Sequence, residues 1–200
     1  MTSRRFFLAA GTIAAASAGM PFKASAAGPA FDRATFEACL RAPFRHRQAF
    51  ASPLVADGAV LGFMFNSLNA YDTGFGEGPG TLHVAAVLYH TGVALALDDD
   101  AWRSFGIAET LRRSGDRVTA SADGNPFVRA PQGRTVGDLQ SRQASFFVCR
   151  NALEDLARRS ATSLELLESH LLPGMSIVPA GVAAINALQE ERFTLFVAAA

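Results

Sequence analysis

The chain has 200 residues, half of them hydrophobic and 18% charged, and its basic and acidic residues balance to a net charge of zero. This apolar content excludes an intrinsically disordered chain, and the absence of net positive charge argues against a nucleic-acid-binding protein. Two cysteines are too few for a disulfide-stapled miniprotein, and the length suits a single domain.

The first residues have the pattern of an export signal. Arg4 and Arg5 form a twin-arginine pair, a weakly apolar run follows over residues 6–20, and Ala24-Ser25-Ala26 offers small residues for cleavage. An apolar run of about 15 residues is too short for a comfortable membrane span. We therefore expect residues 1–26 to be a twin-arginine signal peptide.

Removal of that signal would leave a single soluble domain, residues 27–200, in the periplasm and without a membrane segment. The cleavage takes away three basic residues and no acidic ones, so the mature net charge becomes −3. Lys23 is the only lysine of the chain. The mature protein therefore cannot use a lysine nucleophile or a lysine Schiff base.

The mature chain is predicted to alternate strands and helices. In chain order the predicted elements are a helix over 31–42, a strand over 45–51, a helix over 60–71, a strand over 82–89, a helical region over 98–113 with a break at Gly106, a short helix over 136–142, a strand over 144–149, a helix over 151–159, a short helix near Thr162, a strand over 176–179, a helix over 182–191 and a strand over 193–197. Val182, Ile185 and Leu188 mark one apolar face of the helix over 182–191.

This alternation predicts the fold class. The runs over 82–89 and 144–149 are almost continuously apolar, which is typical of parallel strands buried on both faces. We therefore expect an α/β fold, a three-layer sandwich with a mostly parallel sheet of about five strands and helices on both faces. Residues 117–131 depart from this alternation and look like an insertion. Asp123-Gly124 lies there between two short β-prone runs, which predicts a hairpin or a mobile flap.

Cys149 is the most informative residue for function. It ends a predicted parallel strand, and Asn151 stands at the start of the next helix. Ligands of open α/β sheets bind at this edge, and a helix N-terminus stabilises a thiolate. Arg150 adds positive charge, so we expect Arg150 and Asn151 to bind substrate beside a nucleophilic Cys149. The alternative is a buried cysteine that only fills space.

His90 ends the other central strand. If the two strands are neighbours, His90 lies at the same edge of the sheet as Cys149, where it can act as a base or form an ion pair with the thiolate. The alternative is a structural histidine bonded to a loop carbonyl.

Other patterns carry less information. The glycine-rich loop over 74–80 precedes a strand, whereas a dinucleotide-binding loop follows one. The four histidines have no metal-ligand spacing, and no motif indicates a cofactor. Cys39 is expected to be buried, although a disulfide between Cys39 and Cys149 is conceivable in the oxidising periplasm.

The C-terminal part resembles the DsrE/DsrF-like family of sulfur-relay proteins. The features that carry the resemblance are a strand that ends in a cysteine followed by Asn-x-Leu, a Leu-Pro-Gly turn, a strand that ends at Pro, and Gly-Val opening a helix. They are found at Cys149, Asn151, Leu153, Leu172–Gly174, Val178-Pro179, Gly181-Val182 and Ile185. Upstream similarity is weaker and extends to about residue 45.

The resemblance implies a single α/β domain over the mature chain, homo-oligomers such as trimers or hexamers, and protein partners that donate or accept sulfur. It also places Cys149 where some members carry a persulfide. Two departures stand out, since this chain has an export signal and residues 117–131 look inserted.

Three functional hypotheses follow. In the first, the protein is a periplasmic sulfur carrier or sulfurtransferase that holds a persulfide on Cys149. In the second, it is a non-catalytic binding module for a small ligand or a protein, and Cys149 is inert. In the third, a disulfide of Cys149 with Cys39 or another chain acts as a redox switch.

Overall fold

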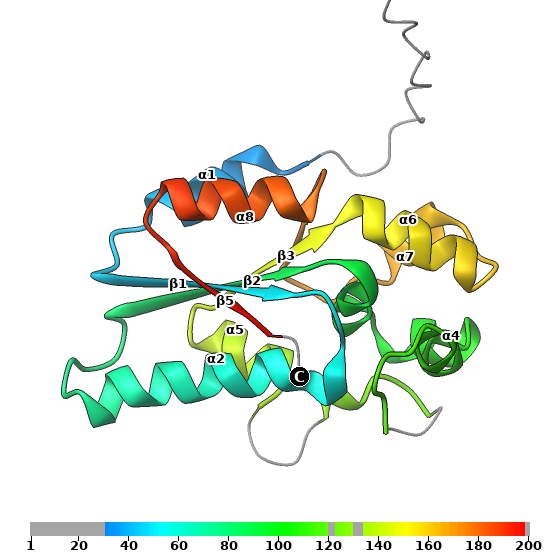
Figure 1. Cartoon of the computed structure of the whole chain (residues 1–200), viewed down its shortest axis with the longest axis horizontal. Coiled ribbons are helices and arrows are strands. Elements are labelled where there is room, and N and C mark those ends of the chain that lie inside the picture. The colour runs from blue at the N-terminus through cyan, green and yellow to red at the C-terminus, as the bar shows by residue number, and fades with distance from the viewer. Residues whose placement is uncertain (1–30, 120–122, 130–133, 199–200) are drawn as a thin grey trace, which may run out of the picture.

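The computed structural model describes residues 31–119, 123–129 and 134–198. They form a three-layer α/β sandwich around a five-stranded parallel sheet (Figure 1). The expected signal peptide, residues 1–26, lies outside the described residues. Within the described ranges, no helix is both long enough and apolar enough to cross a membrane.

The sheet has the strand order β4-β3-β2-β1-β5, and each neighbouring pair is parallel. Its strands are β1 (His46–Ser52), β2 (Leu82–Leu88), β3 (Ser145–Cys149), β4 (Met175–Val178) and β5 (Thr194–Val197). The predicted fold class and the five predicted strands are confirmed. β2 and β3 are direct neighbours, so their carboxyl ends lie side by side.

Helices cover both faces of the sheet (Figure 1). One face carries α1 (Arg33–Arg41) and α8 (Gly181–Glu190), and the other carries α2 (Ala59–Asn69) and α5 (Val136–Ser141). The remaining helices lie toward the carboxyl ends of the strands: α3 (Asp99–Ser104), α4 (Ile107–Arg113), α6 (Arg150–Arg159) and α7 (Leu164–Ser169).

The continuous apolar run of β2 supplies both layers of the core. All seven of its residues are buried. Ala85 and Val87 pack with the α1 and α8 layer, whereas Val84, Ala86 and Leu88 pack into the larger cluster on the opposite face. Side chains of a strand alternate between its two faces, so a strand covered on both sides is mostly apolar, and His83 is the one polar residue of β2.

The helical region after β2 divides where the sequence predicts. The Asp98 side chain accepts a hydrogen bond from the Ala101 N–H at the start of α3, which satisfies a free backbone donor. Gly106 has a left-handed φ of 57° and separates α3 from α4. The predicted break at this residue is confirmed.

Two buried groups hold the loops that follow β1 and β2. Gly92 lies so close to β1 that a Cβ atom there would stand 2.2 Å from the Ser52 carbonyl oxygen. The buried Asp116 carboxylate accepts hydrogen bonds from the backbone N–H groups of Val55 (2.7 Å) and Ala56 (3.0 Å) and from the Thr91 hydroxyl (2.5 Å). One carboxylate thus joins the loop after β1, the loop after β2 and the end of α4.

Of the segment 117–131, predicted as a hairpin or a mobile flap, the structure describes residues 117–119 and 123–129, and for these the hairpin prediction is wrong. They contain no strand and instead form a short 3₁₀ turn, Pro126–Val128. Asn125 is fully buried, and its amide donates hydrogen bonds to the carbonyl oxygens of Leu97 (2.6 Å) and Leu95 (3.3 Å). The turn-prone Asp-Gly pair is therefore followed directly by a buried residue, Asn125. Its side-chain amide fixes this segment by hydrogen bonds to two backbone carbonyls.

Candidate functional site

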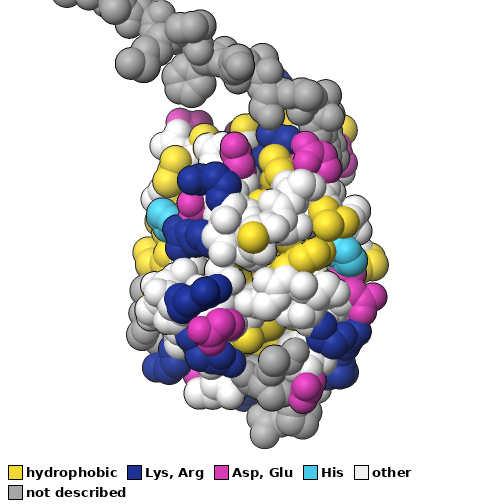
Figure 2. All heavy atoms as spheres, turned by 90° about the vertical axis from the view of Figure 1, so that its right-hand side faces the viewer, with side chains coloured by type: hydrophobic (Ala, Val, Ile, Leu, Met, Phe, Trp, Pro, Cys, Tyr) yellow, Lys and Arg dark blue, Asp and Glu magenta, His cyan; other side chains and the backbone are white. Residues whose placement is uncertain are grey.

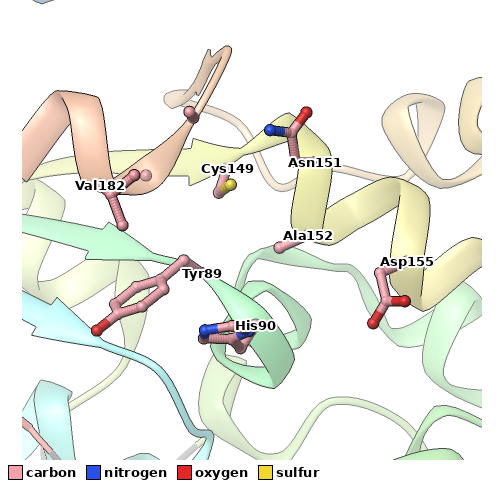
Figure 3. A pocket seen from close by; sticks show the side chains of 9 residues that line it. Tyr89, His90, Cys149, Asn151, Ala152, Asp155 and Val182 are labelled. Atoms are coloured by element: carbon pink, nitrogen blue, oxygen red, sulfur yellow. The ribbon is translucent and has the colours of Figure 1, made fainter. Parts of the chain in front are cut away.

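A pocket opens at the carboxyl ends of β2 and β3. It has a volume of about 240 Å³. Its lining residues come from the end of β2 and from the starts of α6 and α8: Tyr89, His90, Cys149, Asn151, Ala152, Asp155, Ala180, Gly181 and Val182 (Figure 3). This is the edge at which ligands of parallel α/β sheets bind.

Cys149 lies at the inner end of this pocket. It is the last residue of β3 and the residue that precedes α6, and it is 6% exposed. Its sulfur is turned toward α6 (Figure 3). No group in the described part of the chain hydrogen-bonds this sulfur, and no side chain caps the start of α6. The thiol thus lies at a helix N-terminus, whose free backbone N–H groups carry partial positive charge.

A second helix N-terminus reaches the same point because of Gly181. A Cβ atom at this residue would lie 2.9 Å from the Tyr89 Cβ and 3.3 Å from the Cys149 Cβ. Glycine is thus required for the close approach of α8 to the ends of β2 and β3. No side chain caps α8 either, so two uncapped helix starts open into one pocket beside Cys149. Side chains cap α1, α3, α5 and α7, whereas α2 and α4, which do not line this pocket, are also uncapped.

His90 lies in the pocket, as the sequence predicts for neighbouring strands. Its φ is 47°, a left-handed conformation that is uncommon for residues other than glycine. Its exposed ring packs against the Tyr89 ring with 5.0 Å between centroids. Figure 3 shows the imidazole facing the space below Cys149. The strained backbone places an imidazole in the pocket that Cys149 also lines, and such strain is often found at functional sites.

The structure brings Asn151 to the pocket and leaves Arg150 out of it. The Arg150 guanidinium points to α7, where its Nε donates to the Glu168 carboxylate at 3.0 Å. Glu168 is buried, which raises the pKa of its carboxyl group, while the Arg150 charge lowers it. Arg150 is therefore held in an ion pair and does not line the pocket as a substrate-binding residue.

Three lining side chains were not singled out from the sequence as site residues. Tyr89 directly follows β2, and burial raises the pKa of its hydroxyl group. Asp155 lies one turn beyond Asn151 on α6, a helical spacing that signals a shared face. Val182, which shares the predicted apolar helix face with Ile185 and Leu188, is 68% exposed and lines the pocket, and α8 buries Gly181, Ala184 and Leu188.

Cys39 lies at the opposite edge of the sheet. Its sulfur is 3.6 Å from His83 Nε2, which is 3.1 Å from the hydroxyl of Ser145, the first residue of β3. Cys149 ends the same strand, ~13 Å further along at the usual rise of a strand. A disulfide needs its Cα atoms within about 7 Å, so the conceivable bond between Cys39 and Cys149 does not fit this fold. Both cysteines are free, and burial raises the pKa of Cys39.

The buried His83 predicts a pH-dependent stability. Burial, with a smaller effect of the Arg47 charge, lowers the pKa of His83 from 6.5 to about 4. Below pH 6.5 His83 is protonated in the unfolded chain but stays neutral in the native protein. The free energy of unfolding therefore falls as the pH drops from 6.5 toward 4. The loss reaches about 3 kcal/mol at 1.36 kcal/mol per pKa unit.

Denaturant unfolding between pH 4 and 8 would measure this loss. The His83→Gln variant keeps a polar partner for Ser145 and lacks the titrating imidazole, so the difference between the two curves isolates His83. Parallel curves for both proteins would contradict the expectation.

Within residues 31–119, 123–129 and 134–198, no cluster of three or more His, Cys, Asp or Glu side chains is placed to hold a metal ion.

Comparisons with known proteins name no function. No protein-family model matches the chain, and no curated protein matches it significantly. Among solved structures, a protein of unknown function from Methanobacterium thermoautotrophicum superposes with a TM-score of 0.45 and 20% sequence identity, over 76% of this chain and 98% of that chain. A similarity at this level says nothing about what the present chain does.

Proposed function

We propose that the protein is a sulfur carrier or sulfurtransferase that holds a persulfide on Cys149, in keeping with its sequence resemblance to the DsrE/DsrF-like family. One observation carries the proposal: the Cys149 thiol, without a hydrogen-bond partner among the described residues, faces a pocket into which two uncapped helix starts open. A thiolate and a persulfide anion are both stabilised by such N–H groups.

The chemistry is a balanced exchange of sulfur. The Cys149 thiolate attacks the outer sulfur of a donor R–S–SH, a new S–S bond forms, and the donor leaves as R–S⁻. An acceptor thiolate then attacks the outer sulfur of Cys149–S–SH, and Cys149 returns to the thiolate. No net oxidant or reductant is needed, and the pocket N–H groups stabilise the negative charge in both steps.

His90 supplies the proton acceptor in this proposal. Its imidazole and the thiol line the same pocket, so it can accept the thiol proton before attack. Asn151 at the start of α6 offers an amide that can hold the outer sulfur or the donor. Arg150 has no direct role, because Glu168 holds it.

Intact-mass spectrometry tests the proposal. The reduced protein, incubated with a polysulfide or with thiosulfate, is expected to gain whole sulfur atoms that a reductant removes. Cys149→Ser should gain none, whereas Cys39→Ser should behave as the wild type. His90→Asn, which suits a left-handed backbone, should slow the gain by about 10- to 100-fold if His90 acts as a base.

A second candidate function is a binding module in which Cys149 is inert. Its support is the low exposure of Cys149, 6%, together with apolar pocket walls from Tyr89, Ala152 and Val182. No sulfur gain on a demonstrably reduced Cys149 with either donor would contradict the carrier and favour this second function.

The cellular setting is part of the proposal. We propose export by the twin-arginine route, which would place the mature protein in the periplasm, and a homo-oligomeric state. Size-exclusion chromatography with light scattering on the mature protein measures the oligomeric state.

A further inference from the structure

The pocket that holds Cys149 limits the size of what can reach the sulfur. Its volume of about 240 Å³ lies below the 300–1,000 Å³ typical of sites for drug-sized ligands. Cys149 is 6% exposed at its inner end, and the starts of α6 and α8 flank it (Figure 3). A cysteine on the surface of a folded protein would have to carry its own backbone into this space, whereas a small thiol enters freely.

The one charged side chain among the described residues that line the pocket forms ion pairs that leave a net positive charge. Asp155 is the one carboxylate among its described lining residues, and both of its oxygens are paired, with Arg158 at 2.9 Å and with Arg159. This triad therefore carries a net charge of +1. Arg150 and Glu168 balance each other. The two uncapped helix starts add partial positive charge on the inner side.

The surface at this end of the sheet carries both signs of charge. Figure 2 shows the side of the molecule at the carboxyl ends of the strands, where apolar side chains lie near the middle and arginines, with carboxylates between them, lie toward both sides. A small anion thus meets positive charge at the rim, apolar walls inside, and a buried thiol without a hydrogen-bond partner at the end.

We infer that the species which exchanges sulfur with Cys149 is a small anionic thiol or its persulfide, and that a cysteine of a folded partner protein does not reach it. This inference rests on the proposed sulfur-carrier function. A carboxylate-bearing thiolate R–S⁻ attacks the outer sulfur of Cys149–S–SH. The S–S bond to Cys149 breaks, R–S–SH forms, and Cys149 leaves as the thiolate.

Alkylation tests the charge preference without any sulfur transfer. Iodoacetate is an anion and iodoacetamide is its neutral analogue of similar size. We expect the ratio of their rates on Cys149, divided by the same ratio on free cysteine, to be about tenfold above one at low salt and to fall with added salt. A ratio at or below one would overturn the anionic preference, even if Cys149 never accepts sulfur.

Variants assign the preference to the pocket rim. Arg158→Gln with Arg159→Gln should lower the ratio several-fold, because Asp155 then carries an uncompensated charge. Arg112→Gln with Arg113→Gln is the matched control, since these two arginines also end a helix and pair with one acid, Glu109, outside the pocket. An equal loss in the control would show a general surface effect and contradict the assignment to the rim.

Sulfur transfer tests the size limit. Persulfidated protein is mixed with mercaptoacetate, 2-mercaptoethanol, cysteamine or a folded protein with one surface cysteine, at equal thiolate concentration, and loss of the sulfur mass is followed. We expect mercaptoacetate to react fastest and the protein thiol slowest. Val182→Trp, a change at a 68% exposed residue, should slow every small thiol by closing the mouth. A protein thiol as fast as mercaptoacetate would overturn the size limit.

Failure of the two ideas can be told apart. If Cys149 takes up no sulfur from any donor, the carrier function is contradicted, and the alkylation ratio still reports whether the pocket prefers anions. If Cys149 loads but shows neither preference, the carrier function stands and the small anionic partner is wrong.

Discussion

Gly92→Ala is expected to lower the free energy of unfolding by about 3 kcal/mol, at the upper end of the cost of overpacking a core. The added Cβ would lie 2.2 Å from the Ser52 carbonyl oxygen, which is backbone at the end of β1. That oxygen also accepts the Tyr89 N–H at 3.1 Å, so moving it disturbs the bond between the ends of β1 and β2. Urea unfolding at pH 7.5 measures the change.

Gly62→Ala is the matched control for this prediction. Gly62 lies inside α2, and the nearest atom to an added Cβ is Arg134 Nη1 at 3.9 Å. Alanine in a helix interior is more stable than glycine by about 0.5–1 kcal/mol, so this variant should gain stability. A Gly92→Ala protein within 1 kcal/mol of the wild type, an interval set by the usual effect of a surface substitution, would contradict the clash.

Gly181→Ala is expected to reduce the reaction of Cys149 with donors by about tenfold or more, a loss of at least ~1.4 kcal/mol of transition-state stabilisation. The new methyl group would lie 2.9 Å from the Tyr89 Cβ and 3.3 Å from the Cys149 Cβ, so the start of α8 must move away from the thiol. The N–H groups of its first turn then lie farther from the reacting sulfur. Stopped-flow sulfur uptake at fixed pH measures the rate.

A control on the same helix separates this effect from lost stability. Ile185→Val removes one methyl group from a partly buried residue of α8, which costs about 0.5–1.5 kcal/mol, and it leaves the helix start in place. Its uptake rate should match the wild type. A normal rate for Gly181→Ala would show that the α8 terminus does not contribute.

The sheet was predictable from the sequence because burial on both faces demands continuous apolar runs. Residues 82–89 and 144–149 have no polar alternation, and only a parallel sheet under two helical layers buries such strands. The placement of His90 and Cys149 at one edge followed from the ends of those strands, since neighbouring parallel strands finish together.

The errors have a common physical origin, which is that tertiary contacts decide where a side chain points. Arg150 was expected at the pocket because it follows Cys149, yet a buried carboxylate 18 residues later pairs with it. Val182 fits an apolar helix face, but the approach of Gly181 to β3 turns Val182 outward. Asp123-Gly124 favours a turn locally, while Asn125 finds two free carbonyls about 28 residues away along the chain.

The Asp116 carboxylate couples the loop after β1 to the loop after β2, because both loops donate hydrogen bonds to it. It accepts from Val55 and Ala56 in the loop after β1 and from Thr91, the residue next to His90, so neither loop can move without pulling the other. The position of His90 therefore depends on the loop after β1, through Thr91 and Asp116. Selection for a different reaction at this site would have to change both loops together, or give up the carboxylate that ties them.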